Sequence, residues 1–224
     1  MMLRIENAII ANSPARPGIQ LGKFLGVTIH ETGNNRPSAT AKSHAIYMNG
    51  NGKLQQVSYH YVVDELAAWH LVPNTEVAWH AGDGNKGDGN MRTIAIEICV
   101  NFPATSPERK KAVENAAELA AKLLKEHGYT SFAGHLFQHH DFSPFGKNCP
   151  MDIRAGYPLD WDDFCRLVDE HLAPSAQEEI TDERAPSADT LYRVQVGAFK
   201  SRENAQNYAD ELRTMGVIGF VREA

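Results

Sequence analysis

The sequence predicts an α/β fold in which a mixed central β-sheet is flanked by helices, followed by a small C-terminal β-α-β unit. Two observations lead to this prediction. Apolar segments with strand-like patterns are separated by segments with helical spacing. An acidic stretch with two prolines then interrupts the chain, and a short strand–helix–strand pattern follows it. We therefore expect a domain at 1–173, a linker at 174–189 and the β-α-β unit at 190–224.

The first third of the chain predicts a strand, a helix and a hairpin. Residues 1–23 contain two prolines and predict irregular structure. Apolar and polar residues alternate over 25–32, which is typical of a strand. The helix that follows ends at Gly50. Residues 57–65 and 67–72 are rich in β-branched and aromatic side chains and predict a β-hairpin.

The middle of the chain predicts the centre of the sheet. Residues 93–100 form a nearly continuous apolar run, as expected of a strand buried on both faces. The next helix has Ser106 as its N-cap, Pro107 at its first position and Gly128 as its stop signal. A further strand is predicted near 136–142.

The last third predicts one more helix of the first domain and then the separate unit. Residues 161–172 have helical apolar spacing and follow Asp160 as N-cap. In the β-α-β unit, we expect a strand at 191–199, a helix that begins after Ser201, and a closing strand at 217–221.

Composition excludes several classes of protein. The chain has 22 Lys and Arg against 28 Asp and Glu, a net charge of −6, which argues against nucleic-acid binding. No run approaches the ~18 apolar residues of a membrane span. Arg4 and Glu6 interrupt the N-terminal apolar segment, so we expect synthesis in the cytoplasm without a signal peptide. Three cysteines cannot all pair, and we expect reduced thiols.

Glu97 is the first candidate catalytic residue because it lies inside the apolar run at 93–100. An ionised carboxylate is costly to bury, and burial raises its pKa toward the range that a general base needs. The alternative is that strand alternation turns this side chain outward. The segment alone leaves both interpretations open.

A histidine and a cysteine near the end of the first domain suggest a metal site. His139 precedes Cys149, with Lys147 between them, and His30 at the end of another strand offers a third ligand. Imidazole nitrogen and thiolate are ligands that zinc prefers, and a catalytic site needs only three protein ligands. The alternative is a structural thiol beside two unrelated imidazoles.

Five ordered motifs within 14–173 resemble those of the zinc-dependent N-acetylmuramoyl-L-alanine amidases of the phage endolysin type, which are related to peptidoglycan-recognition proteins. The motifs are VTIHET, SYHYVVDE, WHAG, TIAIEICV, and H-x-D followed by GKNCP. The resemblance implies a mixed sheet with helices on its faces and one Zn²⁺ per chain. It also implies hydrolysis of the amide bond between N-acetylmuramic acid and L-alanine of the stem peptide in bacterial peptidoglycan.

Transferred position by position, the resemblance makes His30, His139 and Cys149 the zinc ligands. It makes Glu97 the acid/base residue and Lys147 the group that stabilises the developing oxyanion. The family pattern places the ligand two residues before the aspartate, so His139 is preferred to its neighbours His135 and His140. If the strand continues through Asp141, this carboxylate is expected to orient a ligand.

Further residues match positions near the substrate groove of the family. Tyr59 is either a groove residue or a core aromatic, whereas His80, beside Trp79 in a glycine-rich loop, is expected to face substrate. Asn34, Asn35 and Arg92 are candidates for hydrogen bonds to sugar or peptide, and equally fit solvated turns.

The C-terminal unit resembles half of a sporulation-related (SPOR) repeat, a peptidoglycan-binding module. Two such tails would complete one module, which predicts a homodimer through 190–224; the alternative is a vestigial end. The resemblance as a whole implies action on the cell wall after release through a holin-type pore. Two rival functions stay open, a non-catalytic peptidoglycan-recognition module and a cysteine peptidase that uses Cys149 and His139.

Overall fold

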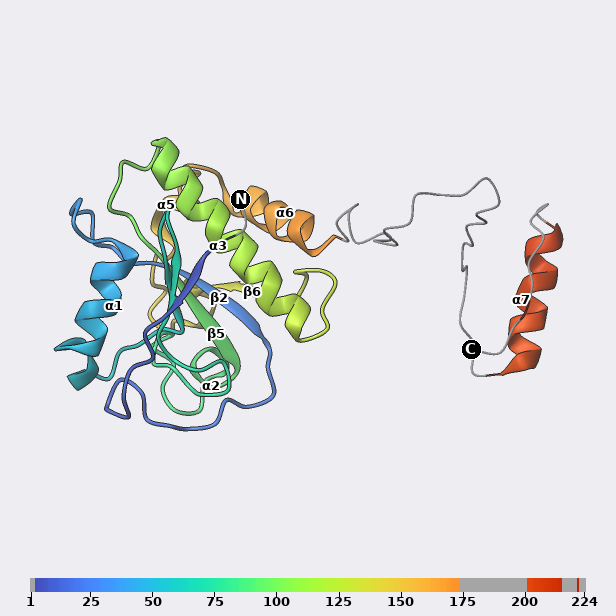
Figure 1. Ribbon diagram of the computed structural model, residues 1–224, viewed down its shortest axis with the longest axis horizontal. Helices are drawn as coiled ribbons and strands as arrows, with labels where there is room; N and C mark the ends of the chain where they lie inside the picture. Colours follow the sequence, from blue (N-terminus) through green and yellow to red (C-terminus); the bar gives the residue numbers. More distant parts are fainter. Residues whose placement is uncertain (1–2, 174–200, 215–220, 222–224) are drawn as a thin grey trace, which may run out of the picture. The chain divides into compact units, whose positions relative to one another are not determined.

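The structure is a computed structural model that describes residues 3–173, 201–214 and 221 of the chain. The chain divides into two compact units, Met1–Glu179 and Ile180–Ala224, which are considered separately (Figure 1). The first unit contains the sheet and all candidate site residues.

The first unit is built on a six-stranded sheet with the order β1-β4-β3-β5-β2-β6. Only β3 and β4 pair in antiparallel fashion, as the predicted hairpin requires; the other neighbours are parallel. The strands are β1 (Ile5–Asn7), β2 (Gly26–Glu31), β3 (Tyr61–Val63), β4 (Ala68–His70), β5 (Thr93–Ile98) and β6 (Leu136–Gln138). The prediction of a mixed sheet with an interior strand at 93–100 is confirmed.

Three helices of the first unit, α1, α3 and α6, begin at a residue whose side chain caps them. The side chains of Thr40, Ser106 and Asp160 each accept a hydrogen bond from a backbone amide in the first turn of the helix that follows. The helices of the first unit are α1 (Ala41–Asn49), the 3₁₀ helix η1 (Gly52–Leu54), α2 (Asp88–Arg92), α3 (Pro107–Glu126), α4 (His139–Phe142), α5 (Met151–Arg154) and α6 (Trp161–Leu172). The predicted N-caps Ser106 and Asp160 are confirmed, as is the helix that ends before Gly50, whose N-cap Thr40 was not predicted.

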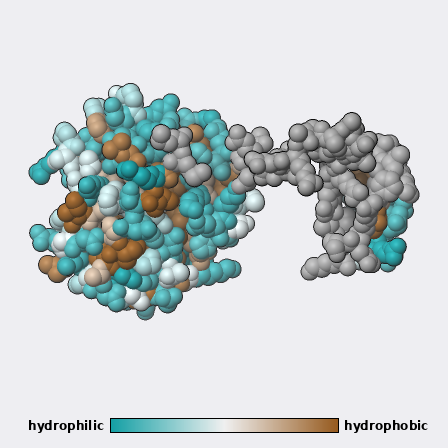
Figure 2. Space-filling view, in the orientation of Figure 1, coloured by the Kyte–Doolittle hydropathy of each residue, from teal (hydrophilic) through white to brown (hydrophobic). Residues whose placement is uncertain are grey.

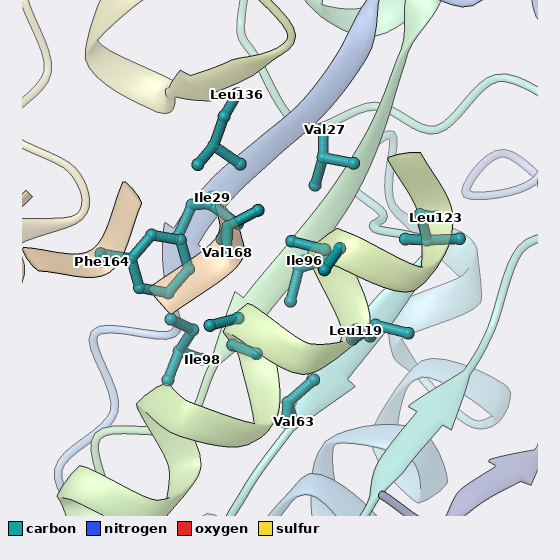
Figure 3. Packing of buried hydrophobic residues seen from close by; sticks show 14 of the residues in the cluster. Val27, Ile29, Val63, Ile96, Ile98, Leu119, Leu123, Leu136, Phe164 and Val168 are labelled. Carbon is teal, nitrogen blue, oxygen red and sulfur yellow. The ribbon is translucent and has the colours of Figure 1, made fainter. Parts of the chain in front are cut away.

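The larger hydrophobic core lies between one face of the sheet and helices α3 and α6 (Figure 3). Alternate residues of β2 and β5, such as Ile29 and Ile96, point into it, and Leu119 of α3 and Phe164 of α6 meet them there. A smaller cluster on the other face packs α1 against β3 and β5. The face of the first unit shown in Figure 2 is mainly hydrophilic, with several hydrophobic residues exposed among the hydrophilic ones.

Two sequence predictions were wrong. Residues 1–23 are not wholly irregular, because Ile5–Asn7 forms the edge strand β1 beside β4. The strand predicted at 136–142 ends at Gln138. There the Asp141 carboxylate accepts a hydrogen bond from the Gln138 amide and closes a capping box, which starts α4. Asp141 therefore caps a helix and does not lie on a strand face shared with His139.

The second unit contains helix α7 (Arg202–Thr214), at the position predicted for the helix of the β-α-β unit. Ser201 Oγ accepts a hydrogen bond from the Asn204 amide at 3.4 Å, as expected of its N-cap. The strand predicted at 191–199 lies outside the described residues, as does 217–221 except for its last residue. None of the helices in the described part of the chain has the length and apolar character to cross a bilayer.

Candidate metal centre

His30 and Glu97 come together because their strands are parallel neighbours in register. The two residues are Cα partners in the β2–β5 pair, so both side chains leave the sheet on the same face. The distance between His30 Nδ1 and Glu97 Oε1 is 4.0 Å. Sequence-distant strands thus place an imidazole beside a carboxylate.

His139 and Cys149 reach the same point from the other side of β2. His139 is the first residue of α4, directly after β6, which pairs with β2. Its Nδ1 lies 3.0 Å from His30 Nδ1, and Cys149 Sγ lies 4.0 Å from that same atom. Within the described residues, these three form the group of donors able to hold a metal ion: their donor atoms all lie within 4.8 Å of one another, and all three residues are buried.

The three donors fit a divalent cation that prefers nitrogen and sulfur. Burial, followed by neighbouring histidines, lowers the pKa of His30 well below its usual value, and burial lowers the pKa of His139 to about 4. Both imidazoles are therefore neutral at neutral pH, the form that binds metals. Two imidazoles and one thiolate match the ligand set of a catalytic zinc site with an open position.

Glu97 has the environment expected of a proton acceptor. Burial raises the pKa of its carboxyl group to about 8, whereas the charge of Lys147 acts in the opposite direction. Its Oε2 is buried and has no hydrogen-bond partner among the described residues. This oxygen is available to a substrate or a water molecule.

The Cys149 thiol is held in its protonated form by the protein alone. Burial raises its pKa to about 12, and the nearby Glu97 carboxylate adds to this shift. The Glu31 backbone hydrogen-bonds the thiol and acts in the opposite direction. A bound cation would lower this pKa, because coordination favours the thiolate over the thiol.

A buried ion-pair cluster that the sequence analysis missed joins the segments carrying His30 and Cys149. Arg109 of α3 is 1% exposed and pairs with Glu31, the last residue of β2. The other Glu31 oxygen accepts the Asp152 amide at 2.7 Å, and the Asp152 carboxylate lies 3.5 Å from Arg109. The available signal was the place of Arg109 on the buried stripe of α3, where an arginine needs a partner.

Two of the predicted substrate residues are buried. Tyr59 belongs to the smaller core cluster, and its hydroxyl lies 3.5 Å from His44 Nδ1. Burial and then the Glu97 carboxylate raise the pKa of the phenol. His80 lies with its Nδ1 3.0 Å from His30 Nε2, on the side of His30 away from the candidate metal position. The neighbouring Trp79 is only partly buried.

The other predicted substrate residues either hydrogen-bond other protein groups or lie exposed. Asn34 Oδ1 accepts the Arg36 amide within its turn, and Asn35 is exposed. Arg92 donates to the Lys23 carbonyl at 3.1 Å and to Asp88 at 3.0 Å. Lys147 is exposed, yet its charge acts on Glu97 and both histidine ligand candidates.

Comparison with known proteins gives two family matches. The profile of the N-acetylmuramoyl-L-alanine amidase family matches residues 20–152, and that of the SPOR domain matches residues 184–223. Among curated proteins, "N-acetylmuramoyl-L-alanine amidase CwlH" of Bacillus subtilis (strain 168) is 36% identical over 148 residues, 66% of this chain and 55% of that protein. The chain spans about half the length of the curated relatives it matches.

Solved structures of similar fold include two that the chain matches over almost their whole length. The structure of the catalytic domain of XlyA aligns with a TM-score of 0.64 at 34% identity, covering 74% of this chain and 99% of that one. The "Mutant endolysin from Bacillus subtilis" aligns with the same TM-score and identity, covering 75% and 99%. The first unit therefore has the fold of these catalytic domains.

Proposed function

The chain belongs to the N-acetylmuramoyl-L-alanine amidase family, and on that premise we propose that it hydrolyses the amide bond between N-acetylmuramic acid and L-alanine in bacterial peptidoglycan. The observation that carries the proposal is the convergence of His30, His139 and Cys149 beside Glu97. Curated relatives bear the name of this activity, which supports the choice of bond.

We propose one Zn²⁺ per chain, held by His30 Nδ1, His139 Nδ1 and Cys149 Sγ. When bound, zinc supplies Lewis-acid polarisation of a carbonyl group and acidification of water. The buried position of the three donors holds them in place before substrate arrives, so little reorganisation is needed.

Glu97 moves the proton in the proposed reaction. Its unpartnered Oε2 accepts a proton from the attacking water, and the carboxyl group then delivers that proton to the leaving L-alanine nitrogen. Burial makes the carboxylate a stronger base than an exposed glutamate, as the pKa of about 8 indicates. Proton uptake and release at one carboxyl group balance over the cycle.

Lys147 stabilises the negative charge that develops on the amide oxygen. The effect of its charge on the pKa values of Glu97, His30 and His139 supports this role. Removal of such a group typically costs ~10²-fold or more in turnover. Tyr59 and Trp79 are proposed to border the groove, with Asn34, Asn35 and Arg92 farther from the metal.

The rest of the chain is proposed to bring the enzyme to the wall. We divide it into a catalytic domain at 1–173, a linker at 174–189 and a wall-binding or dimerisation repeat at 190–224; the SPOR match at 184–223 supports this role for the tail. Light scattering tests dimerisation: a monomer at micromolar concentration would contradict it. A phage-type endolysin released through a holin-type pore is our proposal for how it reaches the wall, and it predicts lysis only when the chain is co-expressed with a pore former.

The rival cysteine peptidase has less support. A nucleophilic cysteine needs a lowered pKa, whereas burial raises that of Cys149 to about 12. The non-catalytic recognition module would need neither the thiol nor Glu97.

Mass spectrometry of digested peptidoglycan tests the proposal. The amidase predicts new L-alanine amino termini, loss of activity with a chelator and recovery with Zn²⁺. New reducing ends, or cuts within the stem peptide, would contradict the assigned bond. Chelator-resistant cleavage would favour the cysteine peptidase, and binding without any cleavage would favour the recognition module.

A further inference from the structure

We propose that the loop of residues 80–90, here called the 80–90 loop, positions both metal-ligating imidazoles, with His80 and Asn90 as its positioning residues. The position of His80 in a glycine-rich loop predicts contact with substrate. In the structure it is 8% exposed and bonded to His30. This inference rests on the proposed zinc site and assigns to the loop the orientation of its two imidazole ligands.

The first step is the orientation of His30 by His80. The distance between His30 Nε2 and His80 Nδ1 is 3.0 Å, and the two rings meet edge to face at 89°. The metal-facing atom of His30 is its other nitrogen, Nδ1. A metal-bound imidazole commonly donates through its second nitrogen, which fixes both ring direction and tautomer.

The direction of this hydrogen bond follows from a chain of donors behind His80. Thr93 has one hydroxyl proton and donates it to the Gly89 carbonyl at 2.7 Å. Thr93 Oγ1 therefore acts as an acceptor toward His80 Nε2, which lies 3.5 Å away, and the His80 ring also hydrogen-bonds the backbone of Gly89 and Thr93.

His80 Nε2 thus carries the proton, and His80 Nδ1 accepts from His30 Nε2. The consequence is that His30 Nδ1 has a free lone pair, directed at the candidate metal position. The Thr93 hydroxyl thus sets the tautomer of His30 through His80, which lies between them.

The second step is the orientation of His139 by the next residue of the same loop. The backbone of Ala81 accepts a hydrogen bond from the His139 ring. Because His139 Nδ1 faces His30, the proton in this bond belongs to the other ring nitrogen. His30 and His139 then present two lone pairs to each other at 3.0 Å, an arrangement that a shared cation stabilises.

The third step is the rigidity of the loop, for which Asn90 is responsible. Asn90 is 3% exposed, and its Oδ1 accepts the amides of His80 and Ala81, both at 2.8 Å. Its Nδ2 donates to the Gly84 carbonyl at 3.0 Å. One buried side chain therefore fixes the backbone of both residues that hold the imidazoles.

Two glycines of the loop, Gly87 and Gly89, serve close packing. A Cβ at Gly89 would lie 2.5 Å from Ala81 Cβ, and one at Gly87 would lie 2.1 Å from the Asp83 carboxyl carbon. Asp83 in turn accepts the amides of Gly89 and Asn90. The turn-rich sequence thus forms a packed support under the metal position.

Zinc affinity in the full-length chain tests the inference, measured by competition with a chromophoric chelator. We expect His80→Leu and Asn90→Ala each to raise the zinc dissociation constant ~10–100-fold, the usual effect of removing a group that orients a ligand. His80→Asn keeps an acceptor near the Nδ1 position and should recover most of the affinity. Asn115→Ala, which removes an equally buried asparagine on α3, should leave zinc affinity unchanged.

Cobalt substitution gives a second readout that general destabilisation does not move. The visible spectrum of bound Co²⁺ reports ligand geometry, and we expect it to change in His80→Leu and Asn90→Ala and to return in His80→Asn. Should His80→Leu fail to fold, Asn90→Ala and His80→Asn test the same contacts.

Wild-type zinc affinity and an unchanged cobalt spectrum in the folded His80 and Asn90 variants would overturn the inference. So would a raised KM for peptidoglycan with unaltered zinc affinity, since that result would return His80 to a substrate role. A wild-type chain that binds no zinc is a different failure, because it would remove the proposed function and the inference together.

Discussion

The two faces of the central sheet are built from the same strands but have different roles. On β2, Val27 and Ile29 point toward α3 and α6, whereas Thr28 and His30 point to the opposite face. On β5, Ile96 and Glu97 divide in the same way. The first face is mainly an apolar core, in which α3 also buries Arg109 and Asn115 with their polar partners. The second face combines the smaller apolar cluster with a network of buried polar groups that ends at the candidate metal position.

Strand alternation therefore places the residues that pack the main core on one face of the sheet and the residues of the candidate site on the other. Apolar packing tolerates small shifts, because dispersion and burial are not directional. The polar face does not, because each buried donor needs an acceptor, as in the 2.6 Å contact between the Thr28 and Thr93 hydroxyls. Substitutions on the two faces should therefore have separable effects.

The largest expected effect comes from exchanging one sulfur on each face. Cys149→Ser removes a metal donor from the polar face and should abolish stoichiometric zinc binding and, with it, activity. Cys165→Ser changes a buried thiol of α6 in the apolar core and should retain one zinc per chain. Elemental analysis of the purified variants measures both, and full zinc content in Cys149→Ser would contradict the ligand assignment.

The next effect compares two glutamates. Glu97→Ala should keep zinc but lower turnover by ~10²–10⁴-fold, because the proton acceptor is lost. Glu118→Ala removes a carboxylate of α3 that accepts the Leu3 amide, and should leave turnover unchanged. Release of L-alanine termini from peptidoglycan gives the rates. A Glu97→Ala enzyme as fast as the wild type would exclude this residue from the mechanism.

The apolar face is tested by a pair of phenylalanines. Phe164→Ala empties a fully buried position in the core and should lower the free energy of unfolding by ~3–5 kcal/mol. Phe145 is 92% exposed, so Phe145→Ala should leave stability nearly unchanged. Urea unfolding measures both variants. If zinc affinity of the folded protein fell in Phe164→Ala as it does in Cys149→Ser, the two faces would not be independent.

The smallest effect is an acid sensitivity built into the polar face. His60 Nε2 donates to the Glu76 carbonyl and Nδ1 accepts the Ala95 amide, so a second ring proton would face the Ala95 N–H. Burial accordingly lowers the pKa of His60 to about 4. As pH falls below ~6.5 the unfolded chain takes up this proton first, and the stability present at higher pH is progressively lost.

The pKa of His60 is roughly 2.5 lower in the folded protein than in the unfolded chain. Between pH 7 and pH 4, its protonation should therefore lower the free energy of unfolding by about 3 kcal/mol. Urea unfolding of the zinc-free protein across this range should show a smaller fall for His60→Gln than for the wild type. His171→Gln, at an exposed position of α6, should keep the wild-type fall. Equal falls in all three proteins would show that His60 does not titrate as its contacts require.

Many of the strands and helices could be predicted from patterns within single segments of the sequence. The alternation over 25–32 and the apolar run at 93–100 gave both strands, and Ser106 and Asp160 marked where α3 and α6 begin. These signals are local, since a strand or helix period and a cap depend on neighbouring residues. The edge strand β1 has only three residues and was missed, because its pairing with β4 is the only reason it is a strand.

The candidate site was predicted unevenly for the same reason. The resemblance of ordered motifs named His30, His139 and Cys149, which the structure brings within 4.8 Å of one another. No local pattern distinguished His80 as a partner of His30 from His80 as a substrate contact. The Arg109–Glu31 ion pair spans 78 residues of sequence; the place of Arg109 on the buried stripe of α3 indicates that it needs a partner, but no local pattern indicates that the partner is Glu31.

By itself, the sequence determined the central strands, the long helices with the N-caps of α3 and α6, and which residue types are available for zinc chemistry. Tertiary structure alone decided which nitrogen of His30 faces the candidate metal position, that Asn90 accepts the amides of His80 and Ala81, and that Arg109 pairs with Glu31 at the end of β2. The physical reason is the sequence distance over which each interaction acts. Propensity, period and capping act over a few residues, whereas hydrogen bonds between buried side chains depend on atoms that only the folded chain brings together.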